Sequence, residues 1–168
     1  VPARLLHGDD PRMVGEPGRG VPTIIEMVNR TRLDCALGAA AQMRHGLVEA
    51  VHHSRNRQAF GKALAAQPLM RSVLADLAVE SEAATLVAMR LAGAYDRGEH
   101  EFARLATPIV KYWLTKRSPG HAAEALECLG GSGYVEDSGM PRLFRQSPLN
   151  SIWEGSGNGI SLDVLRAV

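Results

Sequence analysis

The residues best suited to chemistry in this 168-residue sequence lie between Asn150 and Asn158, where the single carboxylate is Glu154. The aromatic Trp153 precedes this carboxylate, and a Gly-Ser-Gly turn follows it. An apolar wall beside a carboxylate can raise its pKa towards neutrality, where it becomes an effective general base. The same carboxylate could instead cap the helix that follows, since negative side chains are favourable near a helix N-terminus. The spacing alone leaves both interpretations open.

Two other glycine-centred segments could bind a ligand. In the segment 57–62 (Arg-Gln-Ala-Phe-Gly-Lys), Arg57 could bind a pyrophosphate while Phe60 packs against a ring. In the segment 130–133 (Gly-Gly-Ser-Gly), bare backbone would allow a flat or phosphorylated ligand to approach closely. The alternative interpretations are a solvated helix end for the first segment and a helix C-cap for the second.

The composition excludes several classes of protein. Nineteen Lys and Arg against eighteen Asp and Glu give a net charge of +1, which provides no general attraction to nucleic acid or membrane. No apolar run is long enough to cross a membrane, and the N-terminus lacks a signal-peptide pattern, so we expect a cytoplasmic protein without membrane contact. Cys35 and Cys128 lie within apolar helical patterns and are predicted to be buried thiols in a reducing compartment.

No metal site is predicted, because the adjacent His52 and His53 would point in different directions on a helix. The chain begins at Val1 rather than methionine and ends within a helical pattern, which is typical of an excerpt from a longer protein.

Apolar residues at spacings of three and four predict a mostly helical chain. The predicted helices are Thr23–Arg55, Leu64–Asp96, His100–Leu129, a short one near Pro141–Gln146, and a last one from Ser156 onward. Residues 1–22 are rich in glycine and proline, and residues 14–21 are predicted to form turns around a short strand. Long helices joined by short turns predict an all-α, antiparallel up-and-down four-helix bundle with an irregular N-terminal segment.

The third of these helices has two features of its own. Pro119 and Gly120 predict a kink or a break near Ser118. Its apolar pattern runs through Phe102, Leu105, Ile109, Tyr112, Trp113, Ala122 and Leu126.

Four motifs in this order resemble the C-terminal half of the flavin-dependent acyl-CoA dehydrogenases. They are Arg57-x-x-Phe-Gly-Lys62, Gly130-Gly-x-Gly-Tyr134, Pro141-Arg-Leu-Phe-Arg145 and Trp153-Glu-Gly-Ser156. The segments 30–38, 67–71 and 150–158 are closer still to the AidB-type branch, the flavoproteins linked to the adaptive response to DNA alkylation. The resemblance implies that residues 1–22 end a middle β-domain with its linker, and that residues 23–168 form the C-terminal helical bundle domain.

The resemblance also implies roles for particular residues. Glu154 matches the base that removes the α-proton of an acyl thioester while the β-hydrogen leaves as hydride to FAD. Some family members carry the base on the first bundle helix instead, but Thr31 holds that position here. The positions that match acyl-CoA cleft residues are Arg32, Trp153 and Gly155, and those that match flavin-binding residues are Arg57, Phe60, Gln67, Glu127, Gly130, Gly131, Ser156 and Asn158.

The partners implied are an acyl-CoA thioester, an electron-transfer acceptor and further copies of the chain, arranged as a dimer of dimers with the flavin site shared between subunits. Alone, without the preceding domains, the fragment is predicted to be inactive. The alternative function is that of an AidB-type flavoprotein that acts mainly by associating with DNA, through a segment beyond this chain. A third hypothesis is a purely structural helical bundle whose glycine segments are only caps.

Overall fold

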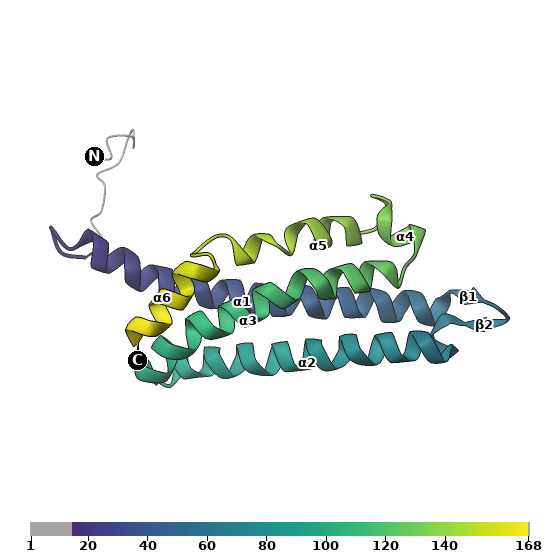
Figure 1. Cartoon of the computed structure of the whole chain (residues 1–168), viewed down its shortest axis with the longest axis horizontal. Helices are drawn as coiled ribbons and strands as arrows, with labels where there is room; N and C mark the ends of the chain where they lie inside the picture. Colours follow the sequence, from purple (N-terminus) through teal and green to yellow (C-terminus); the bar gives the residue numbers. More distant parts are fainter. Residues whose placement is uncertain (1–14, 168) are drawn as a thin grey trace.

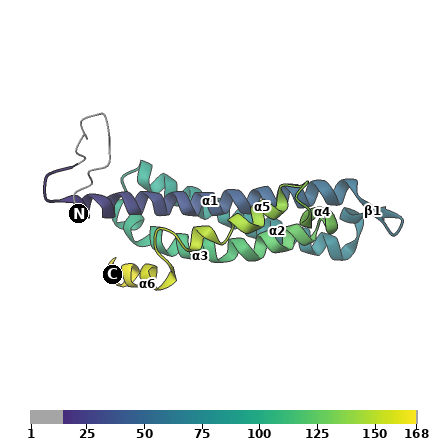
Figure 2. The same cartoon turned by 90° about the horizontal axis from the view of Figure 1, so that it is seen from above.

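The computed structural model describes residues 15–167 and has the predicted all-α architecture. Three long helices, α1 (Gly20–Asn56), α2 (Pro68–Asp96) and α3 (His100–Glu127), run up, down and up beside one another (Figure 1). The fourth position along the bundle is filled by a chain of shorter helices that runs back along α1 and α3 (Figures 1 and 2). These are α4 (Gly131–Tyr134), α5 (Met140–Gln146), a 3-10 turn (Leu149–Ser151) and α6 (Gly157–Ala167).

Glycine and proline determine where the long helices end. Pro68 occupies the first turn of α2, where its missing N–H costs no helical hydrogen bond. Gly98 has a φ of +67° and ends that helix, as predicted. At the N-terminus, residues 15–19 form turns, but α1 already begins at Gly20, so the strand expected within residues 14–21 does not form over residues 15–21.

A short hairpin joins α1 to α2. Strand β1 (Gln58–Ala59) pairs antiparallel with β2 (Lys62–Ala63), and a 3-10 turn (Leu64–Ala66) leads into α2. The hairpin projects beyond the end of the bundle opposite to α6 (Figure 1). It therefore presents its tip, at Phe60 and Gly61, away from its own chain.

The core consists largely of small residues, which allow the helices to approach closely. One cluster joins the middle of the three long helices through Ala36, Ala39, Ala40, Met43, Ala84, Ala88 and Leu114. A second cluster lies towards the hairpin end and contains Leu47, Ala50, Leu77, Ala125, Cys128, Leu129 and Met140. Both cysteines are buried and free, as predicted.

In α3 the break expected near Ser118 does not form, and part of the apolar pattern expected for this helix is exposed. The helix continues through Pro119, because the proline removes a single hydrogen bond while buried residues on both sides hold the helix in place. The predicted apolar pattern is only partly buried, since Phe102, Ile109 and Tyr112 are each more than 40% exposed, whereas Ala122 is buried and Trp113 and Leu126 pack against the core. The buried residues of α3 are Ala103, Thr107, Pro108, Lys111, Leu114, Thr115, Ser118, His121, Ala122 and Ala125.

Within residues 15–167, no helix is both long enough and apolar enough to span a membrane.

Candidate functional site

The turn that carries Glu154 connects the 3-10 turn to α6 and has an unusual backbone. Glu154 has a φ of +57°, a left-handed conformation that non-glycine residues seldom adopt, and Gly155 follows with a φ of +103°. The Glu154 side chain is half-buried, and its carboxylate has no hydrogen-bond partner among residues 15–167. The carboxylate is thus available to a ligand, while its backbone is held in a strained geometry.

Two cationic side chains from two helices bind the carbonyl groups of this turn. Arg32 of α1 donates from Nε to the Glu154 carbonyl oxygen at 2.8 Å. Lys111 of α3 donates from Nζ to the carbonyl oxygens of Trp153, at 2.6 Å, and Gly155, at 2.7 Å. Three successive carbonyls therefore each accept a charge-assisted hydrogen bond, and such bonds are stronger than neutral ones.

A second ion pair ties the turn to the helix that follows it. The Arg32 guanidinium lies 2.7 Å from the Asp163 carboxylate of α6, and only 11% of the Arg32 side chain is exposed. A Cβ on Gly155 would approach this guanidinium to 3.1 Å, so the position suits glycine for its space as well as its φ. Arg32, predicted to line the acyl-CoA cleft, lies directly beneath the turn as a structural support.

The electrostatics of this region follow from burial. Lys111 is fully buried, and its desolvation lowers the pKa of the amine, an effect that the nearby Glu154 carboxylate opposes. Burial raises the pKa of the Cys35 thiol, so the thiol stays protonated beside the amine.

Trp153 is fixed beside Glu154 by a hydrogen bond of its own. Its indole Nε1–H donates to the Asn150 side-chain oxygen at 3.1 Å. Asn150 is buried and donates in turn to Gln42 of α1, at 3.4 Å. The indole remains 46% exposed, so it forms a wall of fixed orientation next to the carboxylate.

At the opposite end of the bundle, the hairpin presents an aromatic side chain. Phe60 is 96% exposed and has a φ of +54°, and Gly61 follows with a φ of +81°. Gln67 donates from its side-chain amide to the Ala59 carbonyl oxygen at 3.1 Å. The Gln67 side chain, predicted to contact the flavin, is thus used within the chain to brace the hairpin.

A hollow of about 690 Å³ beside the hairpin brings together four residues predicted to bind the flavin. Its lining includes Arg57, which follows α1, and Glu127, Gly130 and Gly131 from the end of α3 and the turn after it. Gly130 has a φ of +58°, and a Cβ on either glycine would meet no other atom within 4 Å, so their backbone is open to a ligand. Gly133, by contrast, is glycine because a Cβ there would collide with the Leu126 carbonyl oxygen.

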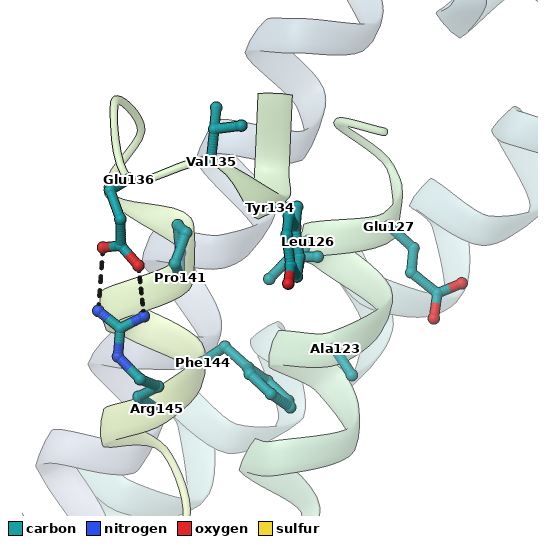
Figure 3. A pocket seen from close by; sticks show the side chains of 9 residues that line it. All are labelled: Ala123, Leu126, Glu127, Tyr134, Val135, Glu136, Pro141, Phe144 and Arg145. Carbon is teal, nitrogen blue, oxygen red and sulfur yellow. Dashed lines mark hydrogen bonds and ion pairs between the residues drawn. The ribbon is translucent and has the colours of Figure 1, made fainter. Parts of the chain in front are cut away.

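An adjoining hollow of about 560 Å³ lies between α3 and α5 and has a more apolar lining (Figure 3). Leu126, Tyr134, Pro141 and Phe144 face it. On one side of this hollow, Arg145 of the motif at 141–145 donates from its two terminal nitrogens to the Glu136 carboxylate, at 2.7 and 3.0 Å. Glu127 belongs to the linings of both hollows.

The predicted residues therefore fall into two groups at opposite ends of the bundle (Figure 1). Arg32, Trp153, Glu154, Gly155, Ser156 and Asn158 lie near α6, whereas Arg57, Phe60, Gln67, Glu127, Gly130 and Gly131 lie near the hairpin. Arg32 and Arg57 are separated by roughly 25 residues of one helix, or about 37 Å. One small ligand cannot contact both groups of the same chain.

Two residues of the Glu154 site escaped the sequence analysis, namely Lys111 and Asp163. Lys111 lies four residues after Thr107 and three before Leu114, so the helical period places it on their buried face. The stronger apolar pattern on the other side of α3 obscured this signal. For Asp163 no signal was available, because its partner Arg32 is remote in sequence.

Within residues 15–167, no three His, Cys, Asp or Glu side chains come together as a metal site would require.

Comparison with known proteins identifies the family. The sequence profile described as "Acyl-CoA dehydrogenase, C-terminal domain" matches residues 18–168, and the chain therefore belongs to the acyl-CoA dehydrogenase family as its C-terminal domain. The chain is 48% identical to AidB of Escherichia coli strain K12, over 93% of this chain and 30% of that protein. It is 37% identical to acyl-CoA dehydrogenase family member 11 of Caenorhabditis elegans, over 96% of this chain and 28% of that protein.

A solved structure has the same fold. Caenorhabditis elegans ACDH-11 in complex with C11-CoA matches with a TM-score of 0.84 and 36% identity, over 92% of this chain and 27% of that one. The chain thus spans about 30% of the length of these relatives.

Proposed function

We propose that this chain is the C-terminal domain of an FAD-dependent acyl-CoA dehydrogenase in which Glu154 removes the α-proton of the acyl thioester. The observation that carries the proposal is the Glu154 turn, where three anchored carbonyl groups fix the backbone that bears an unpaired carboxylate next to the Trp153 indole. A general base needs this combination of a fixed direction and a partly apolar surrounding. The C11-CoA bound to ACDH-11, a relative of 36% identity, supports an acyl-CoA thioester as substrate.

The residues at the hairpin end fit the nucleotide part of FAD. The open backbone of Gly130 and Gly131 offers N–H donors, Arg57 offers a guanidinium to phosphate, and Phe60 offers an exposed ring. Glu127 adds a negative charge to this hollow, which Arg57 in the same lining can offset. When bound, the flavin supplies the acceptor for the β-hydride.

The separation of the two groups of residues supports a flavin site shared between subunits. Because about 37 Å of α1 separates Arg32 from Arg57, the base and the hairpin of one chain serve different flavins. We therefore propose a homo-oligomer in which the hairpin of one chain reaches the flavin beside Glu154 of another, with electrons passed on to a separate acceptor protein.

The test is substrate-driven reduction of the flavin in the full-length protein under anaerobic conditions. Acyl-CoAs of different chain length and branching are added, and bleaching of the flavin absorbance is followed. Glu154→Gln should reduce the rate of bleaching by at least 100-fold while flavin content stays unchanged, because the amide cannot accept the proton. Glu82→Gln, at an exposed glutamate of α2, is the matched control. Unchanged bleaching in Glu154→Gln would refute the assignment of the base.

A second candidate is the role of an AidB-type flavoprotein that associates with DNA. The 48% identity to AidB favours it. This candidate predicts stoichiometric flavin, no bleaching by any acyl-CoA, and retention of duplex DNA that falls steeply with salt, since phosphate contacts release counterions.

A further inference from the structure

Lys111 is the one lysine among residues 15–167 that is fully buried, and an apolar residue at this place in α3 would fill the same space. Burying an ammonium group is unfavourable unless it is paired or hydrogen-bonded. What Lys111 provides beyond such an apolar residue is therefore the two hydrogen bonds that it donates.

Those two bonds go to the residues on either side of Glu154. Nζ lies 2.6 Å from the Trp153 carbonyl oxygen and 2.7 Å from that of Gly155, and both bonds reach from the middle of a long, rigid helix. Rotation of the Glu154 backbone out of its left-handed conformation would move these two carbonyls away from the amine. The direction of the carboxylate is thus coupled to the position of Nζ.

We infer that Lys111 is a positioning residue for the base, whose buried amine fixes the turn and thereby the direction of the Glu154 carboxylate. This inference rests on the proposed function of Glu154. Arg32 supports the same turn but is itself bound to Asp163, so its position depends on α6. The support that Lys111 gives to the turn, by contrast, depends only on the position of α3.

The test compares Lys111→Met with wild type in the full-length flavoprotein. Methionine keeps the length and apolar stem of the side chain and removes the donors. We expect kcat for acyl-CoA to fall about 100-fold, as for a displacement of a catalytic group by about 1 Å, with KM and flavin content nearly unchanged. Lys116→Met, at an exposed lysine of the same helix, is the matched control and should keep wild-type kcat. A wild-type kcat in Lys111→Met would overturn the inference.

Backbone hydrogen exchange gives a readout that does not depend on activity. Residues 153–157 should exchange faster in Lys111→Met than in Lys116→Met and in wild type, because the turn has lost two of its anchors. Equal exchange in all three proteins would overturn the inference. If no acyl-CoA bleaches the wild-type flavin, the assignment of the base fails, and the exchange measurement still decides whether Lys111 holds the turn.

A second variant guards against a general folding defect. Lys111→Gln is shorter but restores two N–H donors without a charge. It should recover part of the kcat lost in Lys111→Met and slow the exchange of residues 153–157. If Lys111→Met does not fold, the comparison is made with Lys111→Gln, whose kcat should lie below that of wild type at unchanged KM. Wild-type kcat and wild-type exchange in Lys111→Gln would overturn the inference.

Discussion

Glu154 combines a strained backbone conformation with a carboxylate that has no hydrogen-bond partner among the described residues. A left-handed φ at a non-glycine residue costs about 1–3 kcal/mol, and such strain persists only where the surroundings hold it. Here the surroundings are the charge-assisted bonds from Arg32 and Lys111. The side chain is left unpaired while its backbone is anchored, which is the arrangement that a base requires.

His121 is a second residue whose surroundings determine its chemistry. Its Nε2–H donates to the Leu77 carbonyl oxygen at 3.0 Å, whereas its Nδ1 is buried without a partner among the described residues and faces Gly46. Desolvation lowers the pKa of this imidazole, and the Leu77 hydrogen bond and the charge of Glu80 oppose the shift only in part. At pH 7 the ring is therefore neutral in the folded chain.

This lowered pKa predicts a loss of stability in acid. Below its ordinary pKa of 6.5, His121 binds a proton in the unfolded chain but not in the folded one, so the free energy of unfolding falls as the pH drops from about 6.5 to the folded pKa. Above pH 6.5 His121 is neutral in both the folded and the unfolded chain, so this loss of stability is absent. Denaturant unfolding at a series of pH values should show a weaker dependence below pH 6.5 in His121→Gln than in wild type. The same dependence in both proteins would contradict this, and His52→Gln, at an exposed histidine, is the control.

At the scale of elements, the hairpin β1–β2 exposes an aromatic ring that the fold of its own chain does not need. Positive φ at Phe60 and Gly61 forms the tip, and Gln67 braces it from within the chain. The ring stays 96% exposed, although burial of such a ring is normally favourable. This geometry is suited to contact with another molecule.

Phe60→Ala should therefore separate stability from flavin binding. Because the ring is 96% exposed, we expect the free energy of unfolding of the chain to change by less than about 0.5 kcal/mol. Loss of an aromatic contact of about 1 kcal/mol should weaken flavin binding by the full-length protein roughly fivefold. Flavin titration followed by fluorescence measures the second effect. The control is Leu69→Ala, at an 81% exposed residue of α2, and equal flavin affinity in the two variants would exclude the contact.

At the scale of the whole molecule, apolar side chains remain on the surface of two long helices. On α2, Val79, Leu86 and Met89 are each more than 55% exposed, and on α3, Phe102 and Ile109 are each more than 40% exposed. Their spacings place each set on one side of its helix. Such stripes are typical of surfaces that other chains or domains cover.

If the α2 stripe lies between subunits, Leu86→Glu should dissociate the full-length oligomer. The glutamate would bury an unpaired charge in the interface while leaving the folded chain intact, since Leu86 is 65% exposed. Sedimentation velocity should then show a smaller species, with a loss of flavin because the shared site is broken. Ser72→Glu, at an exposed residue of α2, adds the same charge elsewhere and should leave the oligomer intact. An unchanged sedimentation coefficient in Leu86→Glu would place the interface on another surface.

The amino-acid sequence was enough to predict the long helices and to propose Glu154 as the base. Local rules were sufficient for α1, α2, α5 and α6, because helical periodicity and the glycine and proline stops act over a few residues. The four motifs identified the family that the comparison then showed. The assigned site roles and the domain boundary at residue 22 remain predictions.

The tertiary structure decided what local rules cannot reach. Two helical patterns overlap in α3, and only packing against α1 and α2 determines that the face with Lys111 is buried and the face with Ile109 exposed. The anchoring of the Glu154 turn depends on Arg32 and Lys111, which lie 122 and 43 residues before Glu154 in the sequence. Contacts over such separations arise from the arrangement of the helices, and this is why the sequence could propose Glu154 as a base but could not indicate which side chains anchor its turn.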